Sequence, residues 1–411
     1  MTQPRINPSR LRDNLERLAE IGKTSDGGVT RVAFTDADIE GREFVKDLMR
    51  NAGMAVRIDP AGNIFGRREG NDRQLPAILL GSHTDTVPDG GAFDGALGVL
   101  AAVEVAQTLT DNDVSTDHPL EVVIWSDEEG GMSGSRAFTG TLPASELDRV
   151  VPAGVTLREG IGRVGGDPSI LDEARCAGNG VAAYVELHIE QGSRLESQGL
   201  DIGIVTGIVA IRHYGVTTKG AANHAGTTPM DNRRNALLAA CDFVLTVDRV
   251  VRSVPGDQVG TVGDLTVHPC APNVIPGDVR FTVELRDMEM AKIDFLWSKL
   301  EPELIACATR YATEAGSDLV HSVDGIGTDP LVREAIVEAA EGLGLSSLQM
   351  PSGAGHDAQN VAKVAPCGMI FVPSVDGVSH SASELTRPED CNHGADVLLR
   401  TLLLLDRGRV R

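Results

Sequence analysis

The pattern of apolar residues changes twice along this chain of 411 residues. The first 200 residues alternate helical and strand patterns, with helices expected at 9–21, 36–50 and 97–109 and strands at 55–58, 77–82 and 121–126. Near-continuous apolar strands that alternate with helices predict an α/β sheet buried on both faces. In such sheets the chemistry lies where the strands end.

A different order follows in the middle of the chain. There the patterns indicate a strand at 204–219, a helix at 231–253, strands at 257–267 and 279–286, a helix at 291–315 and a short strand at 317–322. This β-α-β-β-α-β order is typical of ferredoxin-like domains. Helix, strand and helix patterns then resume from 329 to 407. We therefore predict an α/β domain formed by residues 1–205 and 326–411, split by an inserted α+β domain at 206–325.

The net charge of −22 restricts the partners. Nucleic acids and anionic membranes attract basic patches, which this composition disfavours. No run approaches the roughly 18 apolar residues of a membrane helix, and the N-terminal residues lack the apolar region of a signal peptide. The six cysteines form no C-x-x-C pair, as is typical of reduced thiols. We expect a cytoplasmic protein with no nucleic-acid and no membrane partner.

The segment Gly81–Pro88 (GSHTDTVP), followed by Gly91–Gly95 (GAFDG), offers possible metal ligands. His83 and Asp94 each follow an apolar run and lie beside glycines that let other groups come close. Imidazole and carboxylate are ligands of zinc and its first-row neighbours. Asp85 is spaced to orient the His83 ring. The pair alone is weak evidence, because many such pairs are surface hydrogen bonds.

Three acids, Asp127, Glu128 and Glu129, directly follow the apolar run 122–125. Neighbouring carboxylates repel one another, so an exposed turn is the simple explanation for any one of them. A metal ion changes that balance because it favours ionised carboxylates. One glutamate could then ligate the ion while the other accepts a proton from water.

Two further histidines complete a candidate ligand set. His188 lies in a β-rich run, where a histidine is more often a satisfied core residue, and His380 lies on a loop of small residues after the strand at 369–373. With His83, Asp94 and Glu129, they are enough for two metals that share one bridging carboxylate. Their spacing along the chain is no signal by itself.

Two residues of the insert are candidates for contact with a ligand. In 279–286 the odd positions are apolar and the even ones polar, so Arg286 points to the open face of its strand. A guanidinium there can hold a carboxylate with two bonds; the alternative is a solvated surface arginine. His224 is flanked by small residues, which suits a ring that meets a ligand.

Several segments resemble the hydantoinase/carbamoylase branch of the M20 metallopeptidase clan. They are the Gly81–Gly95 motif, Gly28–Thr35 (GVTRVAFT), Asp59–Arg67 (DPAGNIFGR), Leu187–Gly192 (LHIEQG), Asn223–Met230 (NHAGTTPM) and Ser352–Ala358 (SGAGHDA). Together they are highly specific. The branch contains N-carbamoyl-L-amino-acid hydrolases, β-ureidopropionases and allantoate amidohydrolases. The resemblance implies a split dimetal-hydrolase catalytic domain with an inserted ferredoxin-like lid and dimerisation domain.

The resemblance also implies roles for individual residues. His83 and His188 would hold one divalent metal, Glu129 and His380 the other, and Asp94 would bridge them. Glu128 would be the general base. His224 matches the lid histidine that polarises the scissile carbonyl, commonly from the partner subunit. Four positions match those that hold the substrate: Gln191, Asn273, Arg286 and Gly355. The metals would be zinc, or manganese, cobalt or nickel, and the protein a homodimer.

The expected reaction is hydrolysis of the ureido C–N bond of N-carbamoyl-L-amino acids to amino acid, CO2 and NH3. Allantoate amidohydrolase and β-ureidopropionase activities are the alternatives. An M20 dipeptidase or aminoacylase is more remote, and a non-catalytic binding protein would not explain the intact ligand set.

Two departures from the family pattern concern the site. The stretch after Glu129 is several residues shorter than usual, which bears on substrate preference, and the proline usual after His380 is absent. Residues 353–358 also fit a G-x-G-x-x-A dinucleotide fingerprint, but without a clear β-α-β unit around them we discount nucleotide binding.

Overall fold

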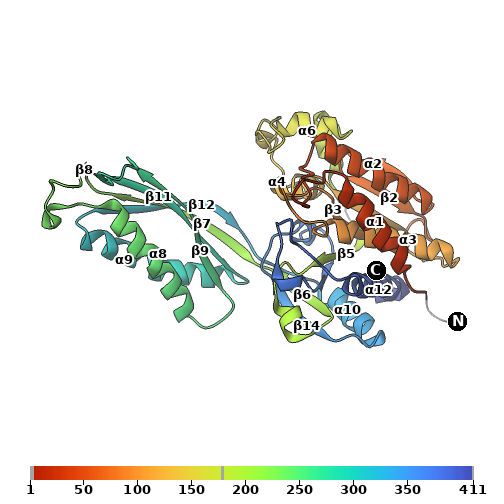
Figure 1. Ribbon diagram of the computed structural model, residues 1–411. Coiled ribbons are helices and arrows are strands. Elements are labelled where there is room, and N and C mark those ends of the chain that lie inside the picture. The colour runs from red at the N-terminus through yellow and green to blue at the C-terminus, as the bar shows by residue number, and fades with distance from the viewer. Residues whose placement is uncertain (1–3, 177–179, 410–411) are drawn as a thin grey trace. The chain divides into compact units, whose positions relative to one another are not determined.

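The computed structural model describes residues 4–176 and 180–409 (Figure 1). Its contacts divide the chain into two compact units. The first combines the chain up to Thr206 with the chain from Gly327 onward, and the second spans Gly207–Ile326. No helix among the described residues is long and apolar enough to cross a membrane.

The first unit contains a mixed sheet with the strand order β1-β2-β4-β3-β5-β15-β6-β13, and β14 pairs with β6. The strands are β1 (Ala55–Ile58), β2 (Ile64–Arg68), β3 (Ala77–His83), β4 (Leu120–Trp125), β5 (Val181–Ile189), β6 (Ile202–Ile208), β13 (Ile326–Gly327), β14 (Ser347–Ser352) and β15 (Cys367–Val372). The four central strands β4, β3, β5 and β15 are parallel to one another. Nearly all their residues are buried, as expected for strands covered on both faces.

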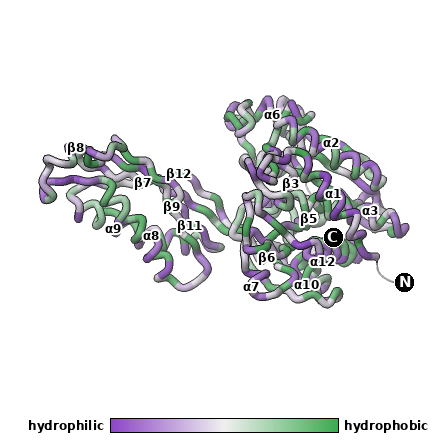
Figure 2. The backbone as a smooth tube through the Cα atoms, in the orientation of Figure 1, coloured by the Kyte–Doolittle hydropathy of each residue, from purple (hydrophilic) through white to green (hydrophobic). Residues whose placement is uncertain are grey.

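Long helices cover this sheet. They are α1 (Pro8–Glu20), α2 (Asp36–Asn51), α3 (Ala96–Asp111), α10 (Pro330–Gly342) and α12 (Pro388–Leu404). Helix α3 contacts β3, β4 and β5, and α12 contacts β15 and β5. Figure 2 shows apolar residues along the central strands, whereas α1 and α2 mix hydrophilic and hydrophobic residues. Shorter helices follow strand ends: α4 (Glu128–Gly131), α5 (Ser133–Phe138), α6 (Leu157–Arg163), α7 (Arg194–Gln198) and α11 (Asp357–Val361).

The second unit is a four-stranded antiparallel sheet with two helices. The elements are β7 (Ala210–Lys219), α8 (Ala236–Ser253), β9 (Val259–His268), β11 (Asp278–Asp287), α9 (Met290–Arg310) and β12 (Glu314–Val323). The strand order β12-β7-β11-β9 and the β-α-β-β-α-β sequence of elements are those of a ferredoxin-like domain. Both helices share one apolar core with the sheet. The predicted fold class is therefore confirmed. The roles of lid and dimerisation surface stay predictions.

Three boundaries differ from our expectation. The run 204–219 is not one strand, because β6 belongs to the first sheet and β7 to the second, with a break at Val209. Helix α8 begins only at Ala236, since the Asn235 side chain accepts hydrogen bonds from the first-turn main chain and caps the helix there. Helix α9 ends at Arg310, and the residues to 315 form a turn and the start of β12.

Candidate metal centre

Two histidines lie at the same edge of the first sheet. His83 is the last residue of β3, and His188 lies near the end of the neighbouring parallel strand β5. Leu80 pairs with Val185, so the register places the two histidines opposite each other three residues further along. Both are 1% exposed, and their ring centroids are 5.9 Å apart. Two rigid strands therefore present both rings at the carboxyl edge of the sheet.

Each ring is held by a main-chain carbonyl oxygen. His83 Nδ1 lies 3.0 Å from the oxygen of Asp85, and His188 Nδ1 lies 2.9 Å from the oxygen of Ile189. A carbonyl oxygen only accepts, so Nδ1 carries the hydrogen of each neutral ring. The lone pair is then on Nε2, as in histidines that bind metals through this atom.

Asp94 lies between two groups of possible ligands: His83 and His188 form the first group, and Glu129 and His380 form the second. Its Oδ1 is 3.1 Å from His188 Nε2 and 3.6 Å from His83 Nε2, whereas its Oδ2 is 3.2 Å from His380 Nε2. The next residue, Gly95, has φ 61°, and a Cβ there would lie 2.4 Å from His83 Nε2, so a larger residue does not fit. One carboxylate thus presents a separate oxygen to each group.

Glu129 and His380 form the second group with Asp94. His380 Nε2 lies 3.5 Å from Glu129 Oε1, and the His380 side chain is 50% exposed. His380 is on the loop after β15 and has a left-handed φ of 53°. Glu129 belongs to the one-turn helix α4. Both of these side chains are therefore carried by short, irregular segments.

The carboxylate of Asp85 holds the turn that carries Glu128 and Glu129. It accepts hydrogen bonds from the main-chain N–H of Glu128 (3.4 Å) and of Glu129 (3.1 Å). Its Oδ1 is 3.7 Å from His83 Nδ1, which is bonded to the Asp85 carbonyl oxygen instead. We expected the carboxylate to orient His83. In the structure the main chain of Asp85 does so, and the carboxylate acts on the next ligand turn.

Glu128 is buried beside the first group. Its Oε2 lies 3.7 Å from His83 Nε2. Burial raises the pKa of Glu128 well above its ordinary range, and the negative charges of Asp357 and Glu129 add to this effect. Burial also raises the pKa of Glu129 to about 7. Buried carboxylates this close together repel one another electrostatically unless a cation offsets their negative charge.

The donor set fits divalent ions. His188 Nε2 is buried and makes no hydrogen bond with a described residue, although Asp94 Oδ1 is 3.1 Å away. A lone pair there faces an acceptor oxygen, and a cation is what would satisfy both. The ligand atoms of His83, Asp94 and His188 lie within 4.8 Å of one another, and so do those of Asp94, Glu129 and His380. Imidazole nitrogen with carboxylate oxygen suits zinc and its neighbours.

Two of the expected substrate contacts are in the first unit. Gln191 Nε2 donates to Asp94 Oδ2 at 2.9 Å and lies 3.5 Å from His380 Nε2, so this amide is at the site. Gly355 precedes α11, and a Cβ there would come within 2.9 Å of Met132 Cε. Met132 belongs to the shortened stretch after Glu129. That stretch therefore contacts the loop that carries Gly355.

His224 lies on the insert in a ribbon formed by β8 (Asn223–His224) and β10 (Val274–Ile275). Asn273 directly precedes β10, and its carbonyl oxygen accepts a hydrogen bond from the main-chain N–H of Ala225. His224 is exposed. Its Nδ1 accepts hydrogen bonds from the main-chain N–H of Gly226 (3.0 Å) and Thr227 (3.3 Å). The hydrogen of the neutral ring is therefore on Nε2, which can donate to a ligand oxygen.

Arg286 lies on the open face of β11, as expected, but it is already paired. Its Nε and Nη2 bind Oε1 and Oε2 of Glu284, each at 2.9 Å. His213 Nε2 lies 2.8 Å from Glu284 Oε2. The two-bond grip that we expected for a substrate carboxylate is thus made with a neighbouring side chain.

Two buried residues that border His188, Glu186 and His356, were not predicted as site residues from the sequence. Glu186 lies two residues earlier on β5, on the same face, and accepts hydrogen bonds from Ser82 Oγ (2.7 Å) and Tyr184 OH (3.0 Å). The His356 ring packs against His188 with centroids 4.5 Å apart. One signal could have identified Glu186: it is an acidic residue in an otherwise apolar strand, two positions before a candidate histidine and so on the same face.

Glu186, His188 and His356 also form a close group, but Glu186 and His356 already have hydrogen-bond partners. The Glu186 oxygens already accept hydrogen bonds, including one from the main-chain N–H of Ala358 (3.2 Å). His356 Nε2 lies 2.9 Å from Ser352 Oγ. Glu186 and His356 therefore pack beside His188. Residues 353–358, which fit the dinucleotide fingerprint, do lie between a strand and a helix. However, α11 has only five residues and packs against Glu186 and His356.

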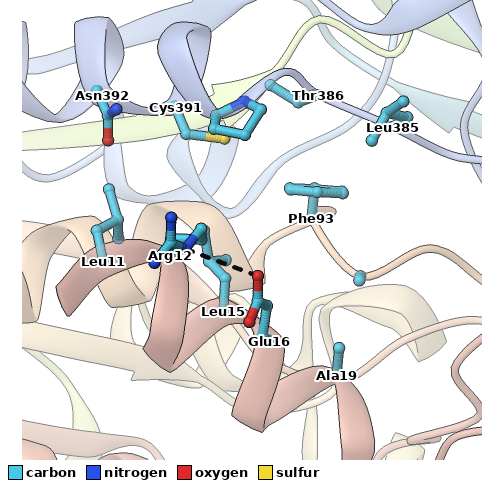
Figure 3. A pocket seen from close by; sticks show the side chains of 12 residues that line it. Leu11, Arg12, Leu15, Glu16, Ala19, Phe93, Leu385, Thr386, Cys391 and Asn392 are labelled. Atoms are coloured by element: carbon cyan, nitrogen blue, oxygen red, sulfur yellow. Dashed lines mark ion pairs between the residues drawn. The ribbon is translucent and has the colours of Figure 1, made fainter. Parts of the chain in front are cut away.

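An apolar cavity of about 260 Å³ lies beside Phe93, the residue before Asp94 (Figure 3). Leu11 and Leu15 of α1 line it, together with Leu385 and Cys391. Its charged groups are an ion pair between Arg12 and Glu16 at 3.8 Å. The lining holds no cluster of metal-ligating side chains, so this cavity is not the candidate catalytic site.

Comparison with known proteins identifies the family of this chain. Residues 79–404 match the family described as peptidase family M20/M25/M40. The chain is 42% identical to the N-carbamoyl-L-amino acid amidohydrolase of Geobacillus stearothermophilus, over 98% of this chain and 100% of that protein. It is 35% identical to the allantoate amidohydrolase of Bacillus subtilis, over 96% and 97% of the two chains. It is also 35% identical to the ureidoglycolate hydrolase of Arabidopsis thaliana, over 97% and 87%.

A solved structure shows the same architecture. The amidase of the hydantoinase/carbamoylase family from Burkholderia multivorans superposes with a TM-score of 0.90 at 38% identity, and 98% of each chain is covered. The similarity therefore includes both units.

Proposed function

This chain belongs to the M20 peptidase family, in its hydantoinase/carbamoylase branch of amidohydrolases that act on ureido and amide C–N bonds, and we propose that its substrates are N-carbamoyl-L-amino acids. Hydrolysis would yield the L-amino acid, CO2 and ammonia. The observation that carries the proposed chemistry is the Asp94 carboxylate, whose two oxygens face two separate groups of ligands. The identity to a named N-carbamoyl-L-amino acid amidohydrolase supports the choice of substrate.

Two divalent ions (zinc, or manganese, cobalt or nickel) would be held in this centre. His83 and His188 would ligate one ion, Glu129 and His380 the other, and Asp94 both. When bound, such ions polarise a carbonyl oxygen and lower the pKa of water.

Glu128 would act as the general base and then as the general acid. It accepts a proton from the attacking water, whose oxygen bonds to the ureido carbon. The bond from that carbon to the terminal nitrogen then breaks, and Glu128 returns the proton to the departing ammonia. The carbamic acid left on the amino nitrogen decomposes to the amino acid and CO2. The burial of Glu128 beside His83 supports this role, which contributes about 10²- to 10⁴-fold in many enzymes.

His224 would donate its Nε2–H to the oxygen that gains charge in the transition state. Arg286 and Asn273 would bind the substrate carboxylate, with Gln191 and Gly355 as further contacts. For Arg286 this requires that Glu284 share the guanidinium or release it.

The geometry of the insert supports a homodimer. Strand β11 from Asp278 to Arg286 spans roughly 27 Å, at about 3.4 Å per residue. The ribbon with His224 and Asn273 lies beyond the Asp278 end, where Gly220 N–H binds the oxygen of Gly277. A ureido amino acid is far shorter than this span. We therefore propose that His224 and Asn273 act on a substrate that is bound at Arg286 of the partner subunit.

Mixed dimers test this arrangement. His224→Ala and Glu128→Gln should each be inactive alone. A dimer with one of each would contain one complete site if His224 acts across the interface. Random assembly makes about half of the dimers mixed, so co-expression should restore about a quarter of the parental activity. If His224 acts within its own subunit, no site is complete and no activity returns.

Allantoate and ureidoglycolate are the competing substrates, since named relatives at 35% identity act on them. A substrate panel with added manganese, cobalt, nickel or zinc, assayed for ammonia, separates the possibilities. It should contain N-carbamoyl-L-amino acids, β-ureidopropionate, allantoate and ureidoglycolate. We expect the highest kcat/KM for an N-carbamoyl-L-amino acid. A higher value for another ureido compound would replace the substrate assignment. Cleavage of dipeptides or N-acyl amino acids without ammonia release would overturn the proposed reaction.

A further inference from the structure

Glu384 is a buried carboxylate that joins two loops of the candidate metal centre. It is 6% exposed and follows His380 by four residues. Its Oε1 accepts hydrogen bonds from the main-chain N–H of Phe93 and of Asp94, each at 3.0 Å. Its Oε2 accepts one from Ser379 Oγ at 2.8 Å. The loop before α3 and the loop after β15, separated by 290 positions, are therefore bonded to the same side chain.

These hydrogen bonds act directly beside ligand residues. One ends on the main chain of Asp94 itself, and another ends on Ser379, which precedes His380. Ser379 Oγ also lies 3.4 Å from Asp94 Oδ2, farther than its 2.8 Å from Glu384 Oε2. Gly91 leaves the space for this carboxylate, since a Cβ there would lie 2.0 Å from Glu384 Oε1.

An apolar cavity borders the same two loops. Phe93 and Leu385, the neighbours of Asp94 and Glu384, border the apolar cavity in Figure 3. Leu385 is 46% exposed. Phe93 also packs against the apolar core, but the cavity leaves the packing here incomplete, and the hydrogen bonds of Glu384 link the two loops directly.

We propose that Glu384 is a positioning residue that keeps Asp94 and His380 close enough to hold one ion together. The proposal rests on the two-ion centre described above. His83 and His188 are placed without Glu384, because they lie at or next to strand ends and are bonded to main-chain carbonyls. Loss of Glu384 should therefore weaken mainly the ion held by Asp94, Glu129 and His380, because the other ion keeps two histidine ligands that Glu384 does not contact.

The experiment compares Glu384→Ala and Glu384→Gln with the parent, all loaded with zinc and then dialysed. Elemental analysis gives zinc per subunit, and competition with a chelating dye gives each Kd. The parent should retain two ions and Glu384→Ala about one, with the weaker Kd raised roughly 10- to 100-fold, as for loss of an outer partner of a metal ligand. Glu384→Gln should bind zinc almost as the parent does, because its amide oxygen can accept both N–H groups and its amide nitrogen can donate to Ser379.

Glu104→Ala is the matched control. Glu104 is 2% exposed and accepts hydrogen bonds from the main-chain N–H of Asn7 (2.8 Å) and from Arg10 Nε (2.6 Å), but it lies in α3 and contacts no ligand residue. Its replacement should lower thermal stability and leave both zinc affinities unchanged. If Glu384→Ala does not fold, Ser379→Ala removes a single link and should raise only the weaker Kd.

Unchanged zinc binding by Glu384→Ala or by Ser379→Ala would overturn the positioning role while the proposed function stands. A glutamine variant as weak as the alanine variant would overturn the hydrogen-bond explanation. If the parent itself fails to retain two ions, the proposed two-ion centre is wrong, and the substrate panel still reports on the reaction.

Discussion

The two halves of the candidate metal centre are built differently. In the strand-end half, His83 and His188 are 1% exposed, lie on neighbouring parallel strands and have Nδ1 bonded to a carbonyl oxygen. In the loop half, Glu129 comes from a one-turn helix and His380 from a loop, with the His380 side chain 50% exposed. Asp94 belongs to both halves.

The difference shows where outer hydrogen bonds are needed. The sheet register already places the strand-end half. The loop half depends on two carboxylates that ligate nothing: Asp85 holds the main chain of Glu128 and Glu129, and Glu384 holds the loops of Asp94 and His380. We therefore expect the loop half to bind its ion more weakly than the strand-end half and to lose it first.

The largest effect should follow replacement of the carboxylate that the halves share. Asp94→Asn keeps the shape but presents an amide N–H2 to one half, so that half meets a donor instead of an oxygen ligand. Zinc binding should weaken by more than the roughly 10- to 100-fold expected for loss of an outer partner, and ammonia release should become undetectable. Elemental analysis after dialysis measures the first effect. Two ions retained by this variant would show that the halves do not share Asp94.

Glu128→Gln should separate chemistry from ion binding in both halves. We expect kcat to fall about 10²- to 10⁴-fold, as for loss of a general base. Zinc content and both Kd values should stay at parental levels, because Glu128 is not assigned as a ligand. Steady-state ammonia release and elemental analysis give the two results. A near-parental kcat would rule Glu128 out as the base, and a loss of zinc would make it a ligand.

Removal of metal should distinguish the halves directly. Titration of the zinc-loaded enzyme with a chelator should release the ions in two steps, the loop half first. His380→Ala should retain the tighter step and lose the weaker one, whereas His188→Ala should lose the tighter step. Release of both ions in one step from the parent would mean that the two halves bind equally well.

The smallest effect should come from Asp85→Asn. Asparagine keeps one acceptor oxygen for the main chain of Glu128 and Glu129 and loses the other, so the loop half should weaken by about 10-fold, the low end for an outer partner. The strand-end half should be unchanged, because His83 is bonded to the main chain of residue 85. Chelator competition resolves the two affinities. A change confined to the tighter ion would show that the carboxylate does orient His83.

The fold class could be predicted because burial follows the sequence period. In β11 the apolar positions of 279–286 are buried and the polar ones are not, and the order of such elements identifies the ferredoxin-like insert. The single strand predicted at 204–219 was wrong because strand-like residues continue through Val209 without interruption. A local pattern does not reveal that the chain leaves one sheet there and enters another.

The candidate ligands could be named from residue type and family resemblance, but their environment could not. The carbonyl oxygens that fix His83 and His188 belong to the main chain and have no side-chain signature. Glu384 gave no signal either, since an acid on a loop is ordinarily exposed. Its burial depends on Gly91, which is almost 300 positions away in the sequence and adjacent in the fold.

Anomalous diffraction from crystals of the zinc-loaded enzyme tests the shared Asp94 most directly. Two peaks are predicted, one bound by His83 and His188 and the other by Glu129 and His380, with a different oxygen of Asp94 on each. The loop-half peak should be the weaker of the two in crystals with limiting zinc. A single peak, or two peaks of which one has no contact with Asp94, would contradict the account.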